Sequence, residues 1–189
     1  MRYSLFMQKI IRPFDYDMES LLKCFRRVSV DSPLPSLSSY SDQTFFDAKE
    51  ESALFALKEA KRVYAGAIIS HDVAASFFTK TNSQRKADDL LDRFSWNGEP
   101  LIVIRLLFVD PGLQRKGFGS MLLKDLYARY KDASFLLSVE KENESALRFF
   151  LKMGFINLGE CLFEYPVAEQ RYFLVKPFSP QGLCREAHW

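Results

Sequence analysis

Two glycines separated by one residue follow a glutamine and two basic residues in the segment LQRKGFGS, residues 113–120. Apolar residues at helical spacing come after it, so we expect the segment to form the turn before a helix. The first amide groups of a helix lack partners, and the helix dipole is positive there. Gly117 and Gly119 let a ligand approach the backbone, and Arg115 and Lys116 add positive charge. This combination indicates an anion site, and a diphosphate bound without a metal fits it best.

Other kinds of glycine loop could explain the same segment. In the phosphate-binding loop of nucleotide hydrolases, the second glycine of GxxxxG is followed by Lys and by Ser or Thr. Gly112 and Gly117 have that separation, but Phe118 and Gly119 follow them, so the lysine and the hydroxyl are absent. The dinucleotide fingerprint GxGxxG fails as well, because Leu122 stands where the third glycine belongs. A plain structural turn stays open, since glycine pairs are common in turns.

Three patterns along the chain together resemble one known family. Residues 114–119, QRKGFG, fit the Gln/Arg-x-x-Gly-x-Gly/Ala signature of the GNAT superfamily of N-acetyltransferases. Residues 108–111 resemble the end of that family's fourth strand. Downstream, Asn143-x-x-Ala146 and residues 152–155, KMGF, are similar to a second segment typical of the family. Because both motifs lie on the right elements at the right separation, the pair is far more specific than either motif alone.

The resemblance implies a donor and a reaction. Acetyl-CoA, or another acyl-CoA, would be the co-substrate, and a primary amine of a small molecule or protein would attack the thioester directly. Residues 114–120 would wrap the pyrophosphate, the backbone of residues 107–109 would pair with the pantetheine arm, and Asn143 would form a hydrogen bond with that arm. An N–H group at or near Val109 would polarise the carbonyl. The donor-binding residues implied in this way are Leu107, Phe108, Val109, Gln114, Arg115, Lys116, Gly117, Phe118, Gly119, Ser120, Asn143 and Phe150.

One position departs from the family pattern. Many members carry a tyrosine seven residues after the asparagine, as a general acid toward the leaving thiolate, and here that position is Phe150. Phenylalanine cannot donate a proton, although a thiol with a pKa of about 8.5 leaves tolerably without help. We expect Phe150 to keep only a packing role against the pantetheine arm. The departure also favours an alternative function, an acyl-CoA-binding regulatory module with little or no turnover.

The residue that would deprotonate the amine is not identified by the sequence, so no catalytic residue is assigned. Histone-modifying members use a glutamate on the fourth strand, but the matching position is Val103. Glu99, Tyr64 and a relay through water are the candidates. Arg105 lies in the same apolar strand, where a charge costs free energy unless it is paired. It would contact either an acidic group of the substrate or a carboxylate of the protein.

Hydrophobic periodicity predicts the elements that must position these residues. The expected strands are 8–14, 53–59, 62–70, 100–109, 134–140, 155–165 and 170–178. The expected helices are 15–29, 43–50, 118–131 and one that begins at Asn143 and ends at Gly154, with some helix within 83–94. The strand–helix–strand unit implies a right-handed parallel crossover, and the hairpins on either side imply antiparallel neighbours.

These elements, like the family resemblance, predict an α/β (α+β) fold. The expected sheet is mixed and mostly antiparallel, with splayed parallel strands at its centre and helices on both faces. Residues 1–178 would form one domain with an insertion at 71–99 between the third and fourth strands, and residues 179–189 a tail. Substrate specificity would reside in 15–50, in the insertion and in 155–178. Within the insertion, Asp88, Asp89 and Asp92 would form either an acidic groove for the substrate or a solvated helix face.

The composition disfavours several other classes of protein. The 26 Lys and Arg residues nearly balance the 24 Asp and Glu residues, and a net charge of +2 does not indicate nucleic-acid binding. Cys24, Cys161 and Cys184 lie far apart and there are two histidines, which disfavours a metal site and a disulfide framework. No apolar run reaches about 18 residues, and the N-terminus lacks a signal-peptide pattern. We therefore expect a cytoplasmic protein without membrane association, and a homodimer stays open.

Overall fold

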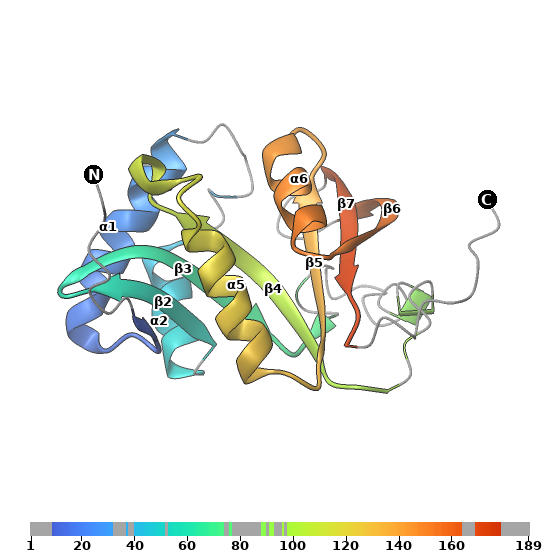
Figure 1. Cartoon of the computed structure of the whole chain (residues 1–189), viewed down its shortest axis with the longest axis horizontal. Coiled ribbons are helices and arrows are strands. Elements are labelled where there is room, and N and C mark those ends of the chain that lie inside the picture. Colours follow the sequence, from blue (N-terminus) through green and yellow to red (C-terminus); the bar gives the residue numbers. More distant parts are fainter. Residues whose placement is uncertain are drawn as a thin grey trace. The chain divides into compact units, whose positions relative to one another are not determined.

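Figure 1 shows the computed structural model of the chain, which describes residues 9–31, 37, 40–51, 53–73, 76, 88–89, 91–92, 96, 98–163 and 169–178. The strands are β1 Lys9–Ile11, β2 Leu54–Glu59, β3 Arg62–Ser70, β4 Leu101–Val109, β5 Ser134–Glu140, β6 Ile156–Phe163 and β7 Glu169–Lys176. The helices are α1 Asp15–Asp31, α2 Asp42–Glu50, α5 Phe118–Arg129 and α6 Glu144–Lys152, and Pro111–Leu113 form the short 3-10 helix η2. Each strand and α-helix matches one predicted from the sequence. Most of the predicted insertion 71–99, with most of its helix within 83–94, and the whole tail 179–189 lie outside the described residues.

The strands form a seven-stranded sheet in the order β1-β2-β3-β4-β5-β7-β6. The pairs β1–β2, β2–β3, β5–β7 and β6–β7 are antiparallel, while β4 and β5 run parallel. A parallel neighbour is what the strand–helix–strand pattern requires. The predicted fold class, a mixed and mostly antiparallel sheet with helices, is confirmed. None of the described helices is long and apolar enough to cross a membrane.

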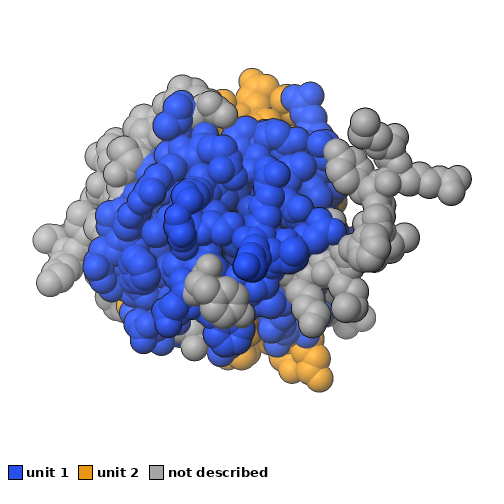
Figure 2. Space-filling model, turned by 90° about the vertical axis from the view of Figure 1, so that its left-hand side faces the viewer, with its two compact units in different colours: residues 1–69, 106–129 blue, residues 70–105, 130–189 orange. Residues whose placement is uncertain are grey.

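The chain divides into two compact units, which Figure 2 colours separately. The first unit contains Met1–Ile69 and Leu106–Arg129, and the second contains Ser70–Arg105 and Tyr130–Trp189. Strand β4 contributes its first half to the second unit and its second half to the first. The organisation of residues 1–178 as one domain stays a prediction.

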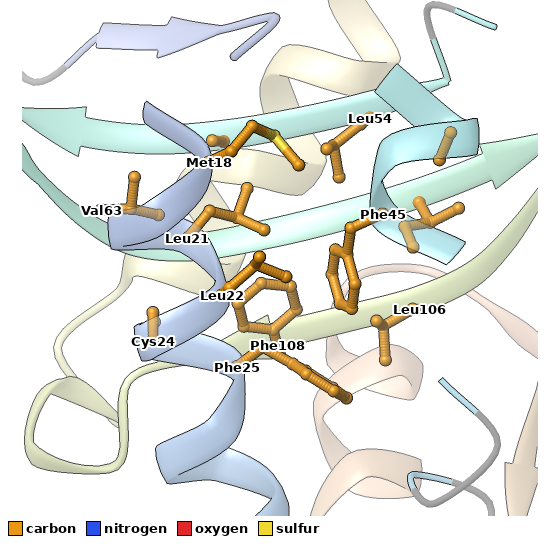
Figure 3. Close-up of a cluster of buried hydrophobic side chains, with 13 residues drawn as sticks. Met18, Leu21, Leu22, Cys24, Phe25, Phe45, Leu54, Val63, Leu106 and Phe108 are labelled. Atoms are coloured by element: carbon orange, nitrogen blue, oxygen red, sulfur yellow. The ribbon is translucent and has the colours of Figure 1, made fainter. Parts of the chain in front are cut away.

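The core of the first unit lies between helices α1 and α2 and one face of the strands (Figure 3). Helix α1 directs Met18, Leu21, Leu22 and Phe25 into this core, at the helical spacing visible in the sequence. Helix α2 adds Phe45, which is fully buried. Burying each large apolar side chain contributes roughly 1.5–3 kcal/mol. The strands supply the opposing side chains of Leu54, Ala56, Val63, Ile68, Leu106 and Phe108.

Helix α5 packs on the opposite face of the first unit's strands. Near its end, the guanidinium carbon of Arg129 lies 5.6 Å from the ring centroid of Phe55. Because successive strand residues point to opposite faces, Phe55 lies on the face opposite Leu54. Helices therefore cover both faces of the sheet in this unit. The buried residues of α5 are Phe118, Gly119, Leu122, Leu123 and Leu126.

The second unit is built on β5, β7 and β6. Its register pairs Leu136 of β5 with Val175 of β7, which brings alternate residues of both strands to one face. Helix α6 begins at Asn143, its N-cap, and Gly154 follows its end with φ 87°, both as the sequence predicts. The buried apolar cluster of this unit contains Val73, Leu101, Val103, Leu136, Phe173 and Val175.

Strand β4 changes character halfway along its length. Leu101–Ile104 are all buried, whereas the second half alternates between buried and partly exposed residues. Among the described residues, β4 pairs with β5 over only three positions, Leu101–Val103 with Ser134–Leu136. The sequence predicts a strand covered on both faces throughout, and this holds only for the first half. The partly exposed residues of the second half are Arg105, Leu107 and Val109.

Candidate functional site

Strand β4 ends in a tight turn that leads into the glycine loop. Oδ1 of Asp110 accepts a hydrogen bond of 3.1 Å from the N–H of Gly112. The carbonyl of Asp110 accepts one of 2.8 Å from the N–H of Leu113, and the N–H of Gln114 donates to the carbonyl of Pro111 at 3.4 Å. An aspartate that binds the backbone two residues further on is a common turn former. The sequence DPG therefore specifies this turn locally.

The backbone next adopts two left-handed residues. Arg115 has φ 61° and Gly117 has φ 90°, on either side of Lys116. A left-handed residue with a Cβ costs about 1–2 kcal/mol, whereas glycine adopts this conformation easily. Helix α5 begins at Phe118, and the N–H of Met121 donates to the carbonyl of Gly117 at 2.9 Å. Left-handed residues in a turn direct neighbouring N–H groups toward one point, which makes a concave site for an anion.

The side chains of this loop leave its backbone accessible. Residues Gln114–Gly117 are exposed, and a Cβ added at Gly117 would meet no atom within 4 Å. The Nζ of Lys116 donates to the carbonyl of Gly112 at 3.0 Å. Phe118 and Gly119 are buried and Ser120 is partly buried, so these residues anchor the start of α5. The loop is therefore an open turn on a fixed helix.

Asp110 is a buried carboxylate that sequence analysis treats only as the end of a strand. Its exposed fraction is 4%, and its Oδ2 lies 2.5 Å from Nη2 of Arg27 and 3.5 Å from Nη2 of Arg62. Burial alone would raise the pKa of Asp110, but hydrogen bonds from Arg27 and from the Gly112 amide outweigh it, so the pKa lies below its ordinary value of 3.8. Because this carboxylate is paired with two arginines, its charge does not oppose an anion in the loop.

Tyr64 supports the same turn from strand β3. Its carbonyl accepts a hydrogen bond of 2.8 Å from the N–H of Asp110, and its ring lies 5.5 Å from the ring of Phe118. Its hydroxyl donates to Oε2 of Glu59 at 2.8 Å. Burial and then the bond to Glu59 raise the pKa of Tyr64. The neutral phenol is thus favoured, which disfavours Tyr64 as a general base.

The three strand residues predicted to bind the pantetheine arm differ in environment. Leu107 and Val109 are partly exposed, while Phe108 is 3% exposed. The ring of Phe108 lies 5.5 Å from that of Phe25 and 6.1 Å from that of Phe45, within the core. The side chain of Phe108 therefore packs the core and does not face a ligand.

Asn143 and Phe150 belong to the second unit and lie at the two ends of α6. Oδ1 of Asn143 accepts a hydrogen bond of 3.1 Å from the N–H of Ala146. Phe150 is 7% exposed, and its ring packs edge-on against those of Phe149 and Phe155, at 5.1 and 5.4 Å. The asparagine oxygen is therefore engaged in capping the helix, and Phe150 is held by neighbouring rings.

The other candidate residues from the sequence lie in different environments from the loop. Oε1 of Glu99 accepts a hydrogen bond of 2.7 Å from the hydroxyl of Ser134. Val103 is fully buried in the apolar cluster of the second unit, and Arg105 is partly exposed. The remaining three are exposed: Asp88, Asp89 and Asp92.

Glu140 is another buried carboxylate, and no sequence pattern points to it. It ends β5 with an exposed fraction of 5%, and its Oε1 lies 3.7 Å from Nη2 of Arg171 on β7. Nη1 of Arg171 also donates to the hydroxyl of Ser138 at 3.2 Å. The strand register creates this pair, so only a prediction of β5–β7 pairing would have found it.

The sequence and the fold of this chain are both similar to those of known proteins. Residues 17–155 match the model of the Acetyltransferase (GNAT) family. The ribosomal-protein-S18-alanine N-acetyltransferase of Escherichia coli has a similar structure, with 20% identity and a TM-score of 0.63 over 92% of this chain and 95% of that one. Arabidopsis thaliana Naa50, solved with the bisubstrate analogue CoA-Ac-MVNAL, has 17% identity and a TM-score of 0.58 over 89% and 97%.

A third structure, the NatC complex bound to Gag peptide and CoA, has 16% identity and a TM-score of 0.62 over 92% of this chain and 98% of that one. At these identities the structural likeness shows the shared fold, and the sequence match shows the family. The match includes the turn at Asp110, the loop Gln114–Ser120 and the cap at Asn143. This chain therefore belongs to the acetyltransferase (GNAT) family.

Proposed function

We propose that this protein transfers an acetyl group from acetyl-CoA to a primary amine of a small molecule or protein, by direct attack of the amine on the thioester. The observation that carries the proposal is the loop at Gln114–Ser120, with left-handed residues at Arg115 and Gly117 before helix α5. Converging N–H groups at a helix N-terminus suit a diphosphate, the group at the centre of CoA. Arg115 and Lys116 offset its charge.

The rest of the donor would lie along β4 and α6. The backbone of Leu107–Val109 would pair with the pantetheine arm. Because the Oδ1 of Asn143 caps α6, its side-chain amide group would donate to a carbonyl of that arm. Phe150, held between the rings of Phe149 and Phe155, would pack against the same arm with its small exposed part.

The reaction requires attack of the amine, departure of the thiolate and removal of the amine proton, and we assign a chemical group to each step. The amine nitrogen bonds to the carbonyl carbon, and the N–H at or near Val109 stabilises the oxyanion. The carbon–sulfur bond then breaks, and CoA leaves as a thiolate. The thiolate takes its proton from water, because Phe150 has none to give and a thiol pKa of about 8.5 makes the thiolate a tolerable leaving group. A water relay would accept the proton of the attacking amine, because Glu99 precedes β4 and lies at the opposite end of that strand from Val109.

The acceptor is the less defined partner. Among the similar proteins, one is named for acetylating an alanine of a ribosomal protein, one is bound to a bisubstrate analogue ending in MVNAL, and one is bound to a Gag peptide. This supports including protein and peptide amines among the acceptors to be tested. Small amines belong in the same panel, because fold similarity at such identities does not determine the acceptor.

A thiol-release assay tests the proposal. The full chain is incubated with acetyl-CoA and, one at a time, with small amines, lysine-containing peptides and peptides with free N-termini, while free CoA is measured with a thiol reagent. Isothermal titration calorimetry with CoA is run in parallel. We expect tight CoA binding and acceptor-dependent thiol release, with the acetylated product identified by mass spectrometry. Absence of CoA binding would refute the assignment of the donor.

Phe150 is the observation that favours a second function. An acyl-CoA-binding regulatory module would keep the loop and lose turnover, and the missing hydroxyl at this position is compatible with it. The same assay separates the two functions. CoA binding without thiol release across the whole panel would support the module, and acceptor-dependent release would exclude it.

A further inference from the structure

Arg27 of α1 and the turn before the glycine loop meet at a single buried carboxylate. Nη2 of Arg27 lies 2.5 Å from Oδ2 of Asp110, and the side chains are 47% and 6% exposed. The other oxygen of Asp110, Oδ1, accepts the N–H of Gly112. One carboxylate therefore binds a helix through one oxygen and the loop through the other.

The backbone of Asp110 is held equally firmly. Its N–H donates to the carbonyl of Tyr64 on β3, and its carbonyl accepts from Leu113, both at 2.8 Å. Arg115, which is left-handed, follows five residues after Asp110. A strained residue of this kind persists only where its surroundings restrain it. The turn at Asp110 is a restraint directly before the loop. Of the two arginines that pair with the Asp110 carboxylate, Arg27 is the closer.

We propose that Arg27 is a positioning residue for the acyl donor, which acts through Asp110 to hold the loop Gly112–Gly117 in the conformation that binds the diphosphate of CoA. The inference rests on the proposed function of that loop. Without Arg27, Oδ2 of Asp110 keeps Arg62, at 3.5 Å, as its one cationic partner among the described residues, while Oδ1 keeps the Gly112 amide. A buried carboxylate with weaker pairing is driven toward water, which would turn it away from Gly112. The turn then opens more often, and the apparent dissociation constant for CoA rises in inverse proportion to the population of the binding conformation.

The first test is the variant Arg27→Met in the full chain, with Arg26→Met as its matched control. Arg26 is the preceding residue of the same helix and pairs with Asp42 on the surface. We expect Arg27→Met to raise the dissociation constant of CoA, measured by calorimetry, about tenfold. The control should stay within about twofold of the wild type. With an acceptor, KM for acetyl-CoA should rise while kcat is retained.

A double-mutant cycle separates positioning from simple attraction between Arg27 and the phosphates. If Arg27 acts through Asp110, the substitution Arg27→Met should have little effect on CoA binding once Asp110→Asn is present. If its charge attracts CoA directly, the loss of affinity should be the same in both backgrounds, which would overturn the proposal. Arg27→Lys, which keeps a cation within reach of Asp110, should restore most of the affinity.

Hydrogen exchange of the free protein tests, without any ligand, whether Arg27 restrains the loop through Asp110. The hydrogen-bonded amides of Gly112, Leu113 and Gln114 should exchange faster in Arg27→Met than in Arg26→Met, while those of β2 and β3 stay unchanged. Equal exchange of the loop in the two variants would overturn the inference. If the wild type fails to bind CoA, the proposed function fails at its donor, whereas faster loop exchange in Arg27→Met would still support the restraint itself.

Discussion

Phe108 of β4 lies so close to Gly66 of β3 that a Cβ added to Gly66 would be 2.4 Å from Cζ of the phenylalanine ring. The ring cannot easily move away, because it is 3% exposed and packs against Phe25 and Phe45. The contact joins the core of the first unit to the strand that leads into the loop Gln114–Ser120. Glycine is thus required at this position by close packing.

Gly66→Ala should therefore destabilise the protein. Overpacking a buried site costs about 1–3 kcal/mol, and urea unfolding of the variant measures that loss. The double variant Gly66→Ala with Phe108→Leu should recover part of it, because leucine lacks the atom that the new Cβ meets. Equal losses for Gly66→Ala in the two backgrounds would show that the ring is not the obstacle.

Gly117→Ala should weaken both the fold and CoA binding. A Cβ at Gly117 meets no atom, so the expected cost of about 1–2 kcal/mol comes from its φ of 90° alone. The matched control is Gly112→Ala, whose φ is not positive and whose Cβ would lie at an ordinary 3.6 Å from Oδ1 of Asp110. The control should change the unfolding free energy by less than about 0.5 kcal/mol. Calorimetry with CoA gives the second readout, and equal affinities of the two variants would argue against the left-handed turn as the donor site.

Phe150→Tyr should accelerate acetyl transfer. The new hydroxyl would protonate the leaving thiolate, and general acids typically contribute about 10²–10⁴-fold, so we expect kcat to rise by about tenfold or more. The gain should be largest at pH values below the thiol pKa of about 8.5, where protonation favours departure. Phe149→Tyr, one residue away on the same helix, is the control and should leave kcat unchanged. An unchanged kcat in Phe150→Tyr would show that the missing acid does not limit the reaction.

The ionisation of Asp110 should make the unfolding free energy of the protein depend on pH in the acidic range. Its pKa is lower in the folded protein than the ordinary value of 3.8, so the ionised form stabilises the fold above that value. This contribution is lost as the pH falls through the lower, folded-state pKa. Urea unfolding should therefore show that the wild type is more stable than Asp110→Asn at neutral pH. This difference in unfolding free energy should become smaller as the pH falls below 3.8. A difference that stays constant on acidification would mean that the charge of Asp110 contributes nothing to stability.

Elements formed by near neighbours in the sequence are predictable from it. The apolar spacing of Met18, Leu21, Leu22 and Phe25 predicts α1, Asn143 predicts the start of α6, and Gly154 predicts its end. These features act through bonds and contacts within about one or two helical turns, so no knowledge of the rest of the chain is needed. The loop motif QRKGFG is equally local, and it leads to the same family as the match over residues 17–155.

Contacts between distant parts of the chain were decided only in three dimensions. The sequence does not show that Arg27 pairs with Asp110, 83 residues away, or that Glu140 meets Arg171 across two strands. It also does not show that, among the described residues, β4 pairs with β5 only over Leu101–Val103, or that Phe108 requires glycine at position 66. Each depends on how the helices and strands pack and register against one another. Periodicity and capping specify the elements, because they act over a few residues, while the partner of a buried charge or ring is chosen by tertiary packing.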